Sequence, residues 1–319
     1  MNRDIKVSIV CNVFNHGKYI RDALEGFVSQ KTDFPFEVLV HDDASTDNSQ
    51  DIIREYEQKY PELIKPIYQS ENQYSQKIPI TLTYQIPRIK GRYVAICEGD
   101  DYWTDSMKLQ KQYDFMEANP EYSMCAASVV WLDMRTDKQM NLCRTEEDRD
   151  VSLEEIVLET KGRVFQTATF FLKKEVFCIR PEWISHFGVG DTPLAMHATL
   201  CGKIRMFADT MAVYRNHAEG SWTSRIEKDV GYKAVVLQRM IGGLTEFNQA
   251  TQYRFDDVVS LRIKRHRYNI GRINRDIKVL RSEELREVYK SRGMKGRISD
   301  VLYCKFPRLQ KLAARILTR

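Results

Sequence analysis

The sequence predicts an α/β protein in which a mostly parallel sheet is flanked by helices and followed by a basic helical C-terminal extension. Apolar runs rich in β-branched residues alternate with helical patterns through residue 120, which is typical of parallel sheets covered by helices on both faces. Acidic residues follow two of these runs, at the sheet edge where such folds bind ligands. Residues 261–319 hold 18 Lys and Arg against 5 Asp and Glu, and residues 1–260 hold 31 against 39. We therefore expect an acidic body and a basic tail.

The elements follow one another in a regular order. β-branched runs predict strands at 5–11, 36–40, 64–68 and 93–97, with a loop at 12–18. Apolar periodicity predicts helices at 19–30 and 106–118, and a helix that ends near Lys59 after an N-cap at Ser45, Thr46 or Asp47. A strand-like segment covers 164–172, and basic helices with breaks at Gly242-Gly243 and Gly271 are expected between residues 224 and 291.

The composition excludes several classes of protein. With 319 residues, 43% of them hydrophobic and 29% charged, the chain can bury a core, which excludes disordered and collagen-like proteins. No stretch approaches the roughly 20 apolar residues of a membrane helix, and no export signal precedes the first strand. The seven cysteines form no Cys-x-x-Cys pair, which favours reduced thiols over disulfides or a zinc site. We expect a cytoplasmic protein.

Two acidic loops follow strands of the predicted sheet. Asp42 and Asp43 follow the second strand, and the run Glu98-Gly99-Asp100-Asp101 follows the fourth. Carboxylates beside a glycine suit a hard cation such as Mg²⁺ or Mn²⁺, which is typically held together with substrate phosphates. Asp43 is a candidate acceptor for the imide N–H of uracil or thymine. Turn formation alone accounts for a single acidic loop, but two loops at one edge favour a binding site.

Four motifs in order resemble the family 2 glycosyltransferases. The matching segments are FNHGKYIRDALEGFVSQ, FEVLVHDDASTDNSQDII, KGRYVAICEGDDYWTDSMKLQKQ and VGDTPLAMHATLCGKIRMFADTMAVYRNHAEGSW. The resemblance implies a GT-A (Rossmann-like) fold that transfers a sugar from a nucleotide-sugar with inversion. It covers roughly residues 5–225. We accordingly expect a GT-A domain at 1–225, with a donor half at 1–120 and a catalytic and acceptor half at 121–225, and a basic helical region at 226–319.

The resemblance implies donor and metal contacts at three places. The segment Asp42–Asp47 matches the family's Asp-Asp-Gly-Ser-Thr-Asp, with Ala44 in place of Gly, so that Asp42 and Asp43 would contact the donor. Glu98-Gly99-Asp100 matches the family's Asp-x-Asp, with Glu98 as a donor contact, Asp100 as metal ligand and Asp101 as the next candidate ligand. The first loop reads Asn12, Val13, Phe14, Asn15 where the family has Pro-Thr-Tyr-Asn. Asn12, Val13 and Asn15 would therefore bind the donor through the backbone, without the hydroxyl usual at position 13.

Gly190-Asp191 matches the pair that carries the family's catalytic base. An acceptor hydroxyl must lose its proton as it attacks the anomeric carbon, and a positioned carboxylate serves as general base. The alternative is that Asp191 caps the helix that starts at Thr192-Pro193.

The run Tyr214-Arg215-Asn216-His217 matches a segment that often carries a histidine for the metal or diphosphate, which makes His217 a candidate ligand. Arg215 would balance diphosphate charge, and the alternative is an exposed arginine on a strand. The loop 218–221 is a candidate lid. Trp222 and Gln166 are candidate acceptor contacts, with an edge plug and a buried polar pair as their structural alternatives.

Two other functions are weighed, one from the basic tail and one from the similarity of fold. A nucleic-acid-binding protein would use the tail, but no RNA-binding motif occurs and aromatic residues are sparse there, so we expect no nucleic acid partner. A nucleotidyltransferase of similar fold would need a Gly-rich basic loop after the first strand, and 12–18 holds none.

Residues 308–319 form an amphipathic pattern. One helical face would carry the apolar residues Leu309, Leu312, Ala313, Ile316 and Leu317, and the other Lys311, Arg315 and Arg319. Such a helix can lie on an anionic membrane surface, and lipid-linked acceptors are common in the family this chain resembles. The alternative is packing on the chain's own helices or on a second subunit of a homodimer.

The motifs together predict an inverting glycosyltransferase that depends on Mn²⁺ or Mg²⁺. The expected donor is a UDP- or dTDP-sugar, and the expected acceptor is a glycan or a lipid-linked glycan of surface polysaccharide biosynthesis. We expect the enzyme to be cytoplasmic and peripheral on the inner face of the membrane.

Overall fold

The computed structural model describes residues 4–142, 145–160, 162–219, 221, 223, 226 and 229–306. The chain divides into two compact units, one of residues 1–180 with 194–224 and one of residues 181–193 with 225–319. Trp222 and the amphipathic segment 308–319 lie outside the described residues. Within the described part of the chain, no helix is long and apolar enough to cross a membrane.

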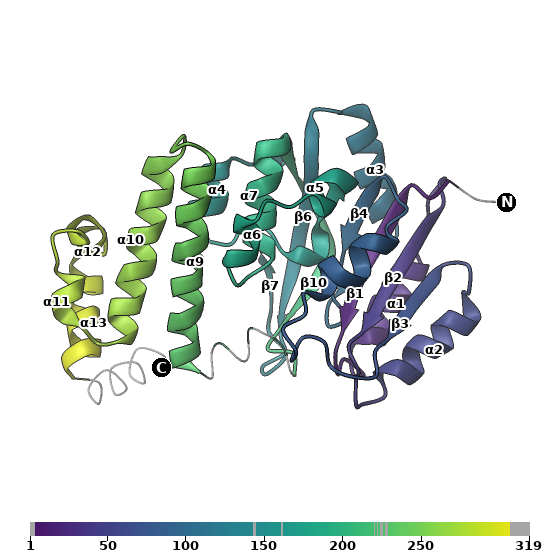
Figure 1. The fold of residues 1–319 in the computed structure, drawn as a ribbon, viewed down its shortest axis with the longest axis horizontal. Helices are drawn as coiled ribbons and strands as arrows, with labels where there is room; N and C mark the ends of the chain where they lie inside the picture. The colour runs from purple at the N-terminus through teal and green to yellow at the C-terminus, as the bar shows by residue number, and fades with distance from the viewer. Residues whose placement is uncertain are drawn as a thin grey trace. The chain divides into compact units, whose positions relative to one another are not determined.

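The first unit is built on a ten-stranded sheet (Figure 1). Its strands are β1 (Val7–Val13), β2 (Phe36–Asp42), β3 (Ile64–Tyr68), β4 (Tyr93–Ile96), β5 (Tyr102–Trp103), β6 (Tyr122–Asp133), β7 (Gln139–Leu142), β8 (Arg149–Asp150), β9 (Phe171–Lys173) and β10 (Lys203–Asn216). They lie in the order β3-β2-β1-β4-β9-β6-β10-β5, with β7 beside β6 and β8 beside β10. The pairs among β1 to β4 and the pair β6 and β10 are parallel, and the others are antiparallel. The predicted α/β class is confirmed, with a mixed second half of the sheet.

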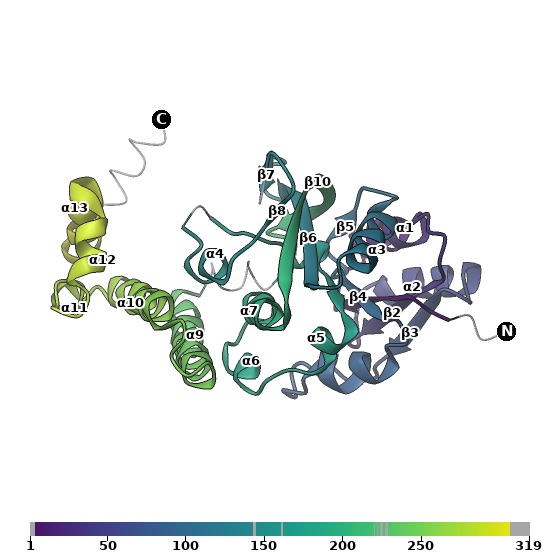
Figure 2. The same ribbon diagram turned by 90° about the horizontal axis from the view of Figure 1, so that it is seen from above.

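Helices cover both faces of this sheet. They are α1 (Ile20–Val28), α2 (Ser49–Lys59), α3 (Lys108–Ala118), α4 (Leu153–Leu158), α5 (Lys174–Cys178), the π-helix η1 (Thr81–Gln85), and the 3₁₀ helices η2 (Ile86–Arg88) and η3 (Thr167–Thr169). In Figure 2, α1 and α3 lie on one side of the sheet and α5 on the other. Helix α7 (Asp191–Cys201) begins in the second unit's residues and ends in the first unit's.

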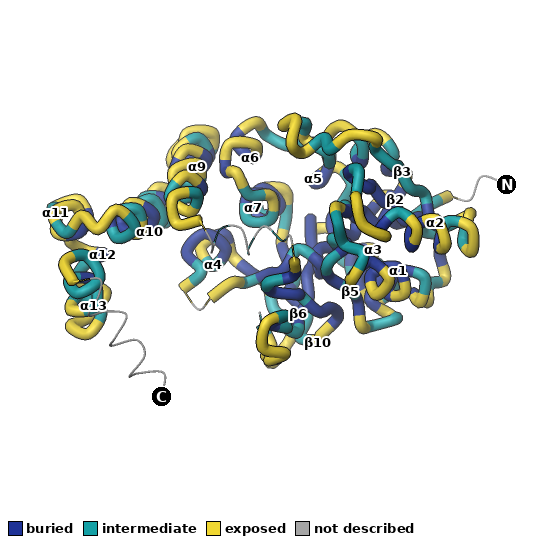
Figure 3. The backbone as a smooth tube through the Cα atoms, turned by 90° about the horizontal axis from the view of Figure 1, so that it is seen from below, coloured by how far each residue is buried: buried dark blue, intermediate teal, exposed yellow. Residues whose placement is uncertain are grey.

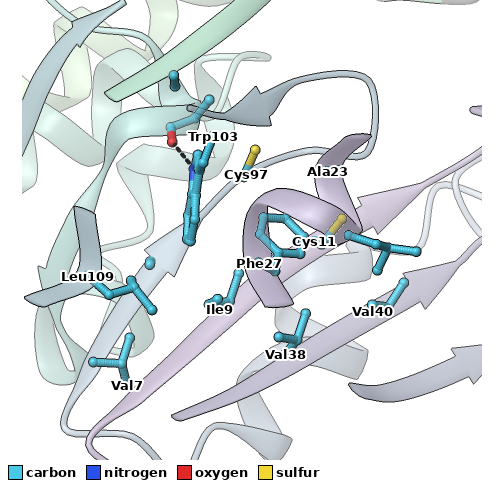
Figure 4. Packing of buried hydrophobic residues seen from close by; sticks show 14 of the residues in the cluster. Val7, Ile9, Cys11, Ala23, Phe27, Val38, Val40, Cys97, Trp103 and Leu109 are labelled. Carbon is cyan, nitrogen blue, oxygen red and sulfur yellow. Dashed lines mark hydrogen bonds between the residues drawn. The ribbon is translucent and has the colours of Figure 1, made fainter. Parts of the chain in front are cut away.

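Alternate residues of the central strands form the main core. Odd-numbered residues of β1, from Val7 to Val13, join Phe27 of α1 and Trp103 of β5 in one buried cluster (Figure 4). The Trp103 ring meets Phe27 edge-on, with centroids 4.9 Å apart. Its Nε1 donates to the Ala168 carbonyl at 2.7 Å, so this buried polar group is satisfied. The core therefore fixes the strand ends that carry the acidic loops.

Two local predictions in the first unit are wrong. Helix α2 begins at Ser49 with Asn48 as N-cap, one to three residues later than the predicted caps. Asp47 instead bridges two segments, because its Oδ1 accepts from Ser49 N at 2.9 Å and its Oδ2 from Gly17 N at 2.8 Å. The predicted strand at 164–172 is also wrong, since η3 interrupts it: both Thr169 N and Thr169 Oγ1 donate to the Gln166 carbonyl.

The second unit is helical. Its described helices are α6 (Trp183–His186), α9 (Val230–Ala250), α10 (Asp256–Ile273), α11 (Ile277–Leu280), α12 (Arg286–Ser291) and α13 (Gly293–Lys305). Buried stretches of α9 and α10 alternate with exposed ones along each helix (Figure 3). Within α10 to α13, the buried Asp300 carboxylate accepts from Tyr268 Oη at 2.5 Å and pairs with Arg272 and Arg292. Three groups thus compensate its charge.

The predicted helix breaks at glycine are wrong. Helix α9 runs through Gly242-Gly243 and α10 runs through Gly271. A Cβ on Gly243 would lie 2.2 Å from the Phe187 ring, and one on Gly271 would lie 3.0 Å from Leu280 Cδ2. These two glycines therefore permit close packing of one helix against its neighbours, and the chain turns at 251–255 instead.

Lys108 is a fully buried cation of the first unit. Its Nζ donates to Gln112 Oε1 at 2.6 Å and lies 4.1 Å from the centroid of the Trp103 ring. Burial lowers the pKa of Lys108 to about 8. Because an unfolded lysine titrates near pH 10.4, the unfolded chain binds more protons than the native protein between the two values.

Lys108→Met should therefore alter how stability depends on pH. In the unaltered protein the Lys108 contribution rises with pH through that window, by about 2 kcal/mol from pH 7 to pH 10 for a shift of this size. The variant lacks this rise. From pH 7 to pH 10, the free energy of unfolding of the unaltered protein should therefore increase by that amount more than the free energy of unfolding of the variant. Urea unfolding of both proteins at the two pH values measures the difference. Parallel pH profiles would contradict the assignment.

Candidate functional site

The carboxyl ends of β1, β2 and β4 meet at one edge of the sheet. Val13 and Asp42 are in register at the ends of β1 and β2. Asp43 N donates to the Val13 carbonyl at 2.9 Å, and Gly99 N donates to the Asn12 carbonyl at 3.1 Å. The structure thus brings the first loop and both acidic loops of the sequence analysis together, as expected for parallel strands.

Asp42 and Asp43 have different surroundings in the loop after β2. Asp42 is fully buried, and its Oδ1 accepts from Ser45 N at 3.0 Å and from Gln50 Nε2 at 2.7 Å. The Asp43 carboxylate accepts from Gln73 N at 2.8 Å and from Tyr74 N at 3.0 Å, so it anchors the loop after β3. A carboxylate offers about four acceptor positions, and Asp43 therefore keeps capacity for a ligand donor.

The first loop is held by contacts with three other segments. Asn12, inside β1, donates its N–H to Glu98 Oε2 at 3.2 Å and accepts from the buried Gln85 Nε2 at 3.2 Å. Asn15 Oδ1 accepts from Thr46 N at 2.7 Å. Phe14, between these contacts, exposes 42% of its surface. Phe14 is therefore an exposed aromatic residue directly after β1, in the loop that meets the acidic loops.

Glu98, Asp100 and Asp101 crowd negative charge into the loop after β4. Burial, and then the charge of Asp100, raise the pKa of Glu98 to about 7. Burial and the same neighbouring charge raise the pKa of Asp101 well above its ordinary value. Like charges crowded in this way are relieved by a cation, and oxygen donors suit Mg²⁺ or Mn²⁺. The oxygen donors present therefore fit a divalent cation in their chemistry, but within the described ranges no group of three or more His, Cys, Asp or Glu is arranged to hold a metal ion.

Arg215, near the end of β10, is buried, so the alternative of an exposed arginine is wrong. Its backbone N–H donates to Asp101 Oδ1 at 2.8 Å. Its guanidinium donates to the Asp100 carbonyl at 3.1 Å and pairs with Asp22 of α1.

The segment after β10 is tied to the start of α1. His217 has a left-handed φ of 63°. Two residues later, Glu219 N donates to Tyr19 Oη at 3.1 Å, and Lys18 Nζ lies 2.5 Å from Glu219 Oε2. These contacts place the start of the candidate lid beside α1.

The two remaining described candidates, Gln166 and Asp191, have local hydrogen-bond partners of their own. Gln166 is buried at the start of η3 and lies 3.5 Å from an Arg163 nitrogen, as in the structural alternative of a buried polar group. Asp191 is the first residue of α7, and its Oδ1 accepts from Thr192 N at 2.7 Å.

Sequence reasoning missed Gln85 and Asp22. Gln85 lies in a segment without clear periodicity, yet its Nε2 contacts the Cys11 and Leu39 carbonyls as well as Asn12. Asp22 has the pattern of an ordinary exposed helix residue, and only the fold reveals its pairing with Arg215, 193 positions away.

Comparison with known proteins shows the family of the chain. Residues 8–180 match the sequence model described as glycosyl transferase family 2. An uncharacterized protein of Mycobacterium bovis is 35% identical over 226 residues, which are 68% of this chain and 61% of that protein. The chain thus spans less than two thirds of that relative's length. TuaG of Bacillus subtilis, named as a glycosyltransferase of teichuronic acid biosynthesis, is 34% identical over 128 residues, which are 40% of this chain and 48% of TuaG.

Solved structures show the same fold. TarS of S. aureus, determined with UDP-GlcNAc, superposes with a TM-score of 0.54 at 16% identity and covers 93% of this chain and 90% of its own. A mannosyltransferase of Pyrobaculum calidifontis, determined with GDP-Man and Mn²⁺, superposes with a TM-score of 0.55 at 13% identity, over 98% and 91% of the two chains. The predicted GT-A glycosyltransferase fold is confirmed.

Proposed function

Because the chain belongs to glycosyl transferase family 2, we propose that it is an inverting, metal-dependent enzyme of surface polysaccharide biosynthesis that transfers a sugar from a UDP- or dTDP-sugar to a glycan or lipid-linked acceptor. The observation that carries this proposal is the acidic edge of the sheet, where the first loop, Asp43 and the Glu98–Asp101 loop meet. Nucleotide release from a panel of donors tests it. The relative named for teichuronic acid biosynthesis supports a polymer of the cell surface as product.

We assign the diphosphate end of the donor to the acidic loop. Asp100 would hold Mn²⁺ or Mg²⁺, with Asp101 and His217 as further candidates and Glu98 facing the ribose or the metal. When bound, the cation supplies positive charge that stabilises the leaving diphosphate. Burial first, and then the charge of Asp100, raise the pKa values of Glu98 and Asp101, and a bound cation would favour the charged form of both carboxylates.

We assign catalysis to Asp191. Its carboxylate accepts the proton of the acceptor hydroxyl while that oxygen bonds to the anomeric carbon and the nucleoside diphosphate departs. A single displacement from the opposite face inverts the configuration at that carbon. Gln166 and Trp222 remain the proposed acceptor contacts.

We assign binding of the donor's nucleobase to Asp43 and Phe14. Asp43 would accept the imide N–H of uracil or thymine, with backbone contacts from Asn12, Val13 and Asn15. The exposed Phe14 ring would stack on the base.

Phe14→Ala should weaken binding of UDP or dTDP. Stacking of a base on an aromatic ring contributes about 1–3 kcal/mol, so the dissociation constant should rise about 5- to 100-fold, and Phe14→Tyr should retain most of the affinity. Isothermal titration calorimetry measures the dissociation constant of each variant for UDP and dTDP. Tyr253→Ala, which removes a 60% exposed ring from the other unit, is the control. Equal affinity of Phe14→Ala and the control would contradict stacking.

We also propose that the enzyme works at the cytoplasmic face of the membrane. Support comes from α13, whose exposed Met294 and Ile298 lie one turn apart beside Lys295 and Arg297. The amphipathic pattern at 308–319 continues this character. Contact with anionic lipid is the proposed role of this region, and dimer formation is its alternative.

A further inference from the structure

We propose that Arg215 is a positioning residue that fixes the acidic loop, so that Asp100 faces the donor while Asp101 anchors the loop to β10. This inference rests on the proposed function, because it concerns how the cation and diphosphate are held. It differs from direct contact between Arg215 and the diphosphate.

The guanidinium of Arg215 has two polar partners and two aromatic neighbours. It donates to the Asp100 carbonyl at 3.1 Å and pairs with the Asp22 carboxylate. Its Cζ lies 4.3 Å from the Tyr102 ring centroid and 5.3 Å from that of Tyr19. Arginine suits such a place because its planar fork both donates and stacks.

These contacts leave Arg215 poorly suited to bind diphosphate. Only 7% of its side chain is exposed, and its charge is compensated by Asp22, whose side chain is 52% exposed. To reach a diphosphate, the Arg215 guanidinium would have to leave both the Asp22 carboxylate and the two stacked rings. Its connection to the donor therefore runs through the backbone of Asp100.

The backbone of Arg215 orients the neighbouring carboxylate. Arg215 N donates to Asp101 Oδ1 at 2.8 Å, and Asp101 N donates to the Glu98 carbonyl at 3.1 Å. Asp101 is therefore buried and turned toward β10. The Asp100 side chain is partly exposed, and within the described part of the chain no hydrogen bond engages its carboxylate. Of the two, Asp100 is the one presented to a cation.

Asp22→Asn is the sharpest test. It removes the charge partner of Arg215 from an exposed helix position and changes no residue of the acidic loop. Glu55→Gln is the matched control: it breaks another ion pair of α1, between Arg21 and Glu55 of α2 at 2.7 Å, and neither of these two residues contacts Arg215 in that pair. Binding of Mn²⁺ in the presence of UDP or dTDP is measured from the electron paramagnetic resonance signal of free Mn²⁺.

Asp22→Asn should weaken Mn²⁺ binding about 10- to 100-fold, the usual effect of removing an outer partner of a metal site, and Glu55→Gln should bind as the unaltered protein does. Arg215→Lys should show a similar loss, since a single ammonium cannot replace the fork. Equal or tighter binding by Asp22→Asn would overturn the inference, because a released guanidinium would then serve the diphosphate directly. If the unaltered protein bound no Mn²⁺ with either nucleotide, the proposed function and this inference would fall together.

Discussion

Asp191→Asn should lower the rate of sugar transfer by at least about 10²-fold, because a positioned general base typically contributes about 10²–10⁴ in rate. Asparagine is nearly isosteric with aspartate and is as good at a helix start, so Asp191 Oδ1's contact with Thr192 N can persist. Donor affinity and melting temperature should therefore change little. Transfer is measured at saturating donor, and nucleotide binding by calorimetry.

Asp229→Asn provides the matched control. Asp229 also starts a helix and accepts a backbone N–H, that of Tyr232 at 2.9 Å, but has no proposed catalytic role. This variant should transfer sugar at the unaltered rate. If Asp191→Asn instead lost stability while its folded fraction kept normal turnover, Asp191 would be a helix cap only.

Asp100→Ala should reduce transfer by at least about 100-fold, because stabilisation of the leaving diphosphate acts mainly in the transition state. Excess EDTA should abolish the activity of the unaltered protein, and Mn²⁺ or Mg²⁺ should restore it. Asp114→Ala, at an exposed position of α3, should leave both activity and metal response unchanged. Full activity of the unaltered protein in EDTA would contradict metal dependence, and full activity of Asp100→Ala would contradict its ligand role.

Local patterns were sufficient to predict much of the first unit. The third strand has the predicted bounds, Ile64–Tyr68, and the other three predicted strands and the three predicted helices occur with shifted ends. Asp43 and Asp100 each follow a strand of the parallel part of the sheet. Their place in the sequence was therefore enough to predict that they lie at one edge. Such predictions succeed because a short β-branched run that is buried on both faces is a local signal for a central parallel strand.

The missed features depend on distant partners. Gly243 and Gly271 have the composition of helix breaks, but Phe187 and Leu280 need the space that a glycine leaves. Asp47 has the composition of an N-cap, but Gly17 shares its carboxylate. From the sequence, Arg215 is a candidate ligand for the diphosphate, but in the fold its guanidinium pairs with Asp22. No single-sequence pattern encodes these pairings, since each joins residues of different elements or loops, and all but the pair of Gly271 and Leu280 lie tens to hundreds of positions apart.

The proposed reaction is the transfer of a sugar from a UDP- or dTDP-sugar to an acceptor. Its most direct test incubates the purified chain with Mn²⁺, a panel of nucleotide-sugars and extracts of surface glycan or glycolipid, and measures free nucleoside diphosphate together with the mass and anomeric configuration of the product. We expect release of UDP or dTDP from one donor, dependent on acceptor, with a product that is heavier by one sugar in the inverted configuration. Release from no UDP- or dTDP-sugar, or a product with retained configuration, would contradict it.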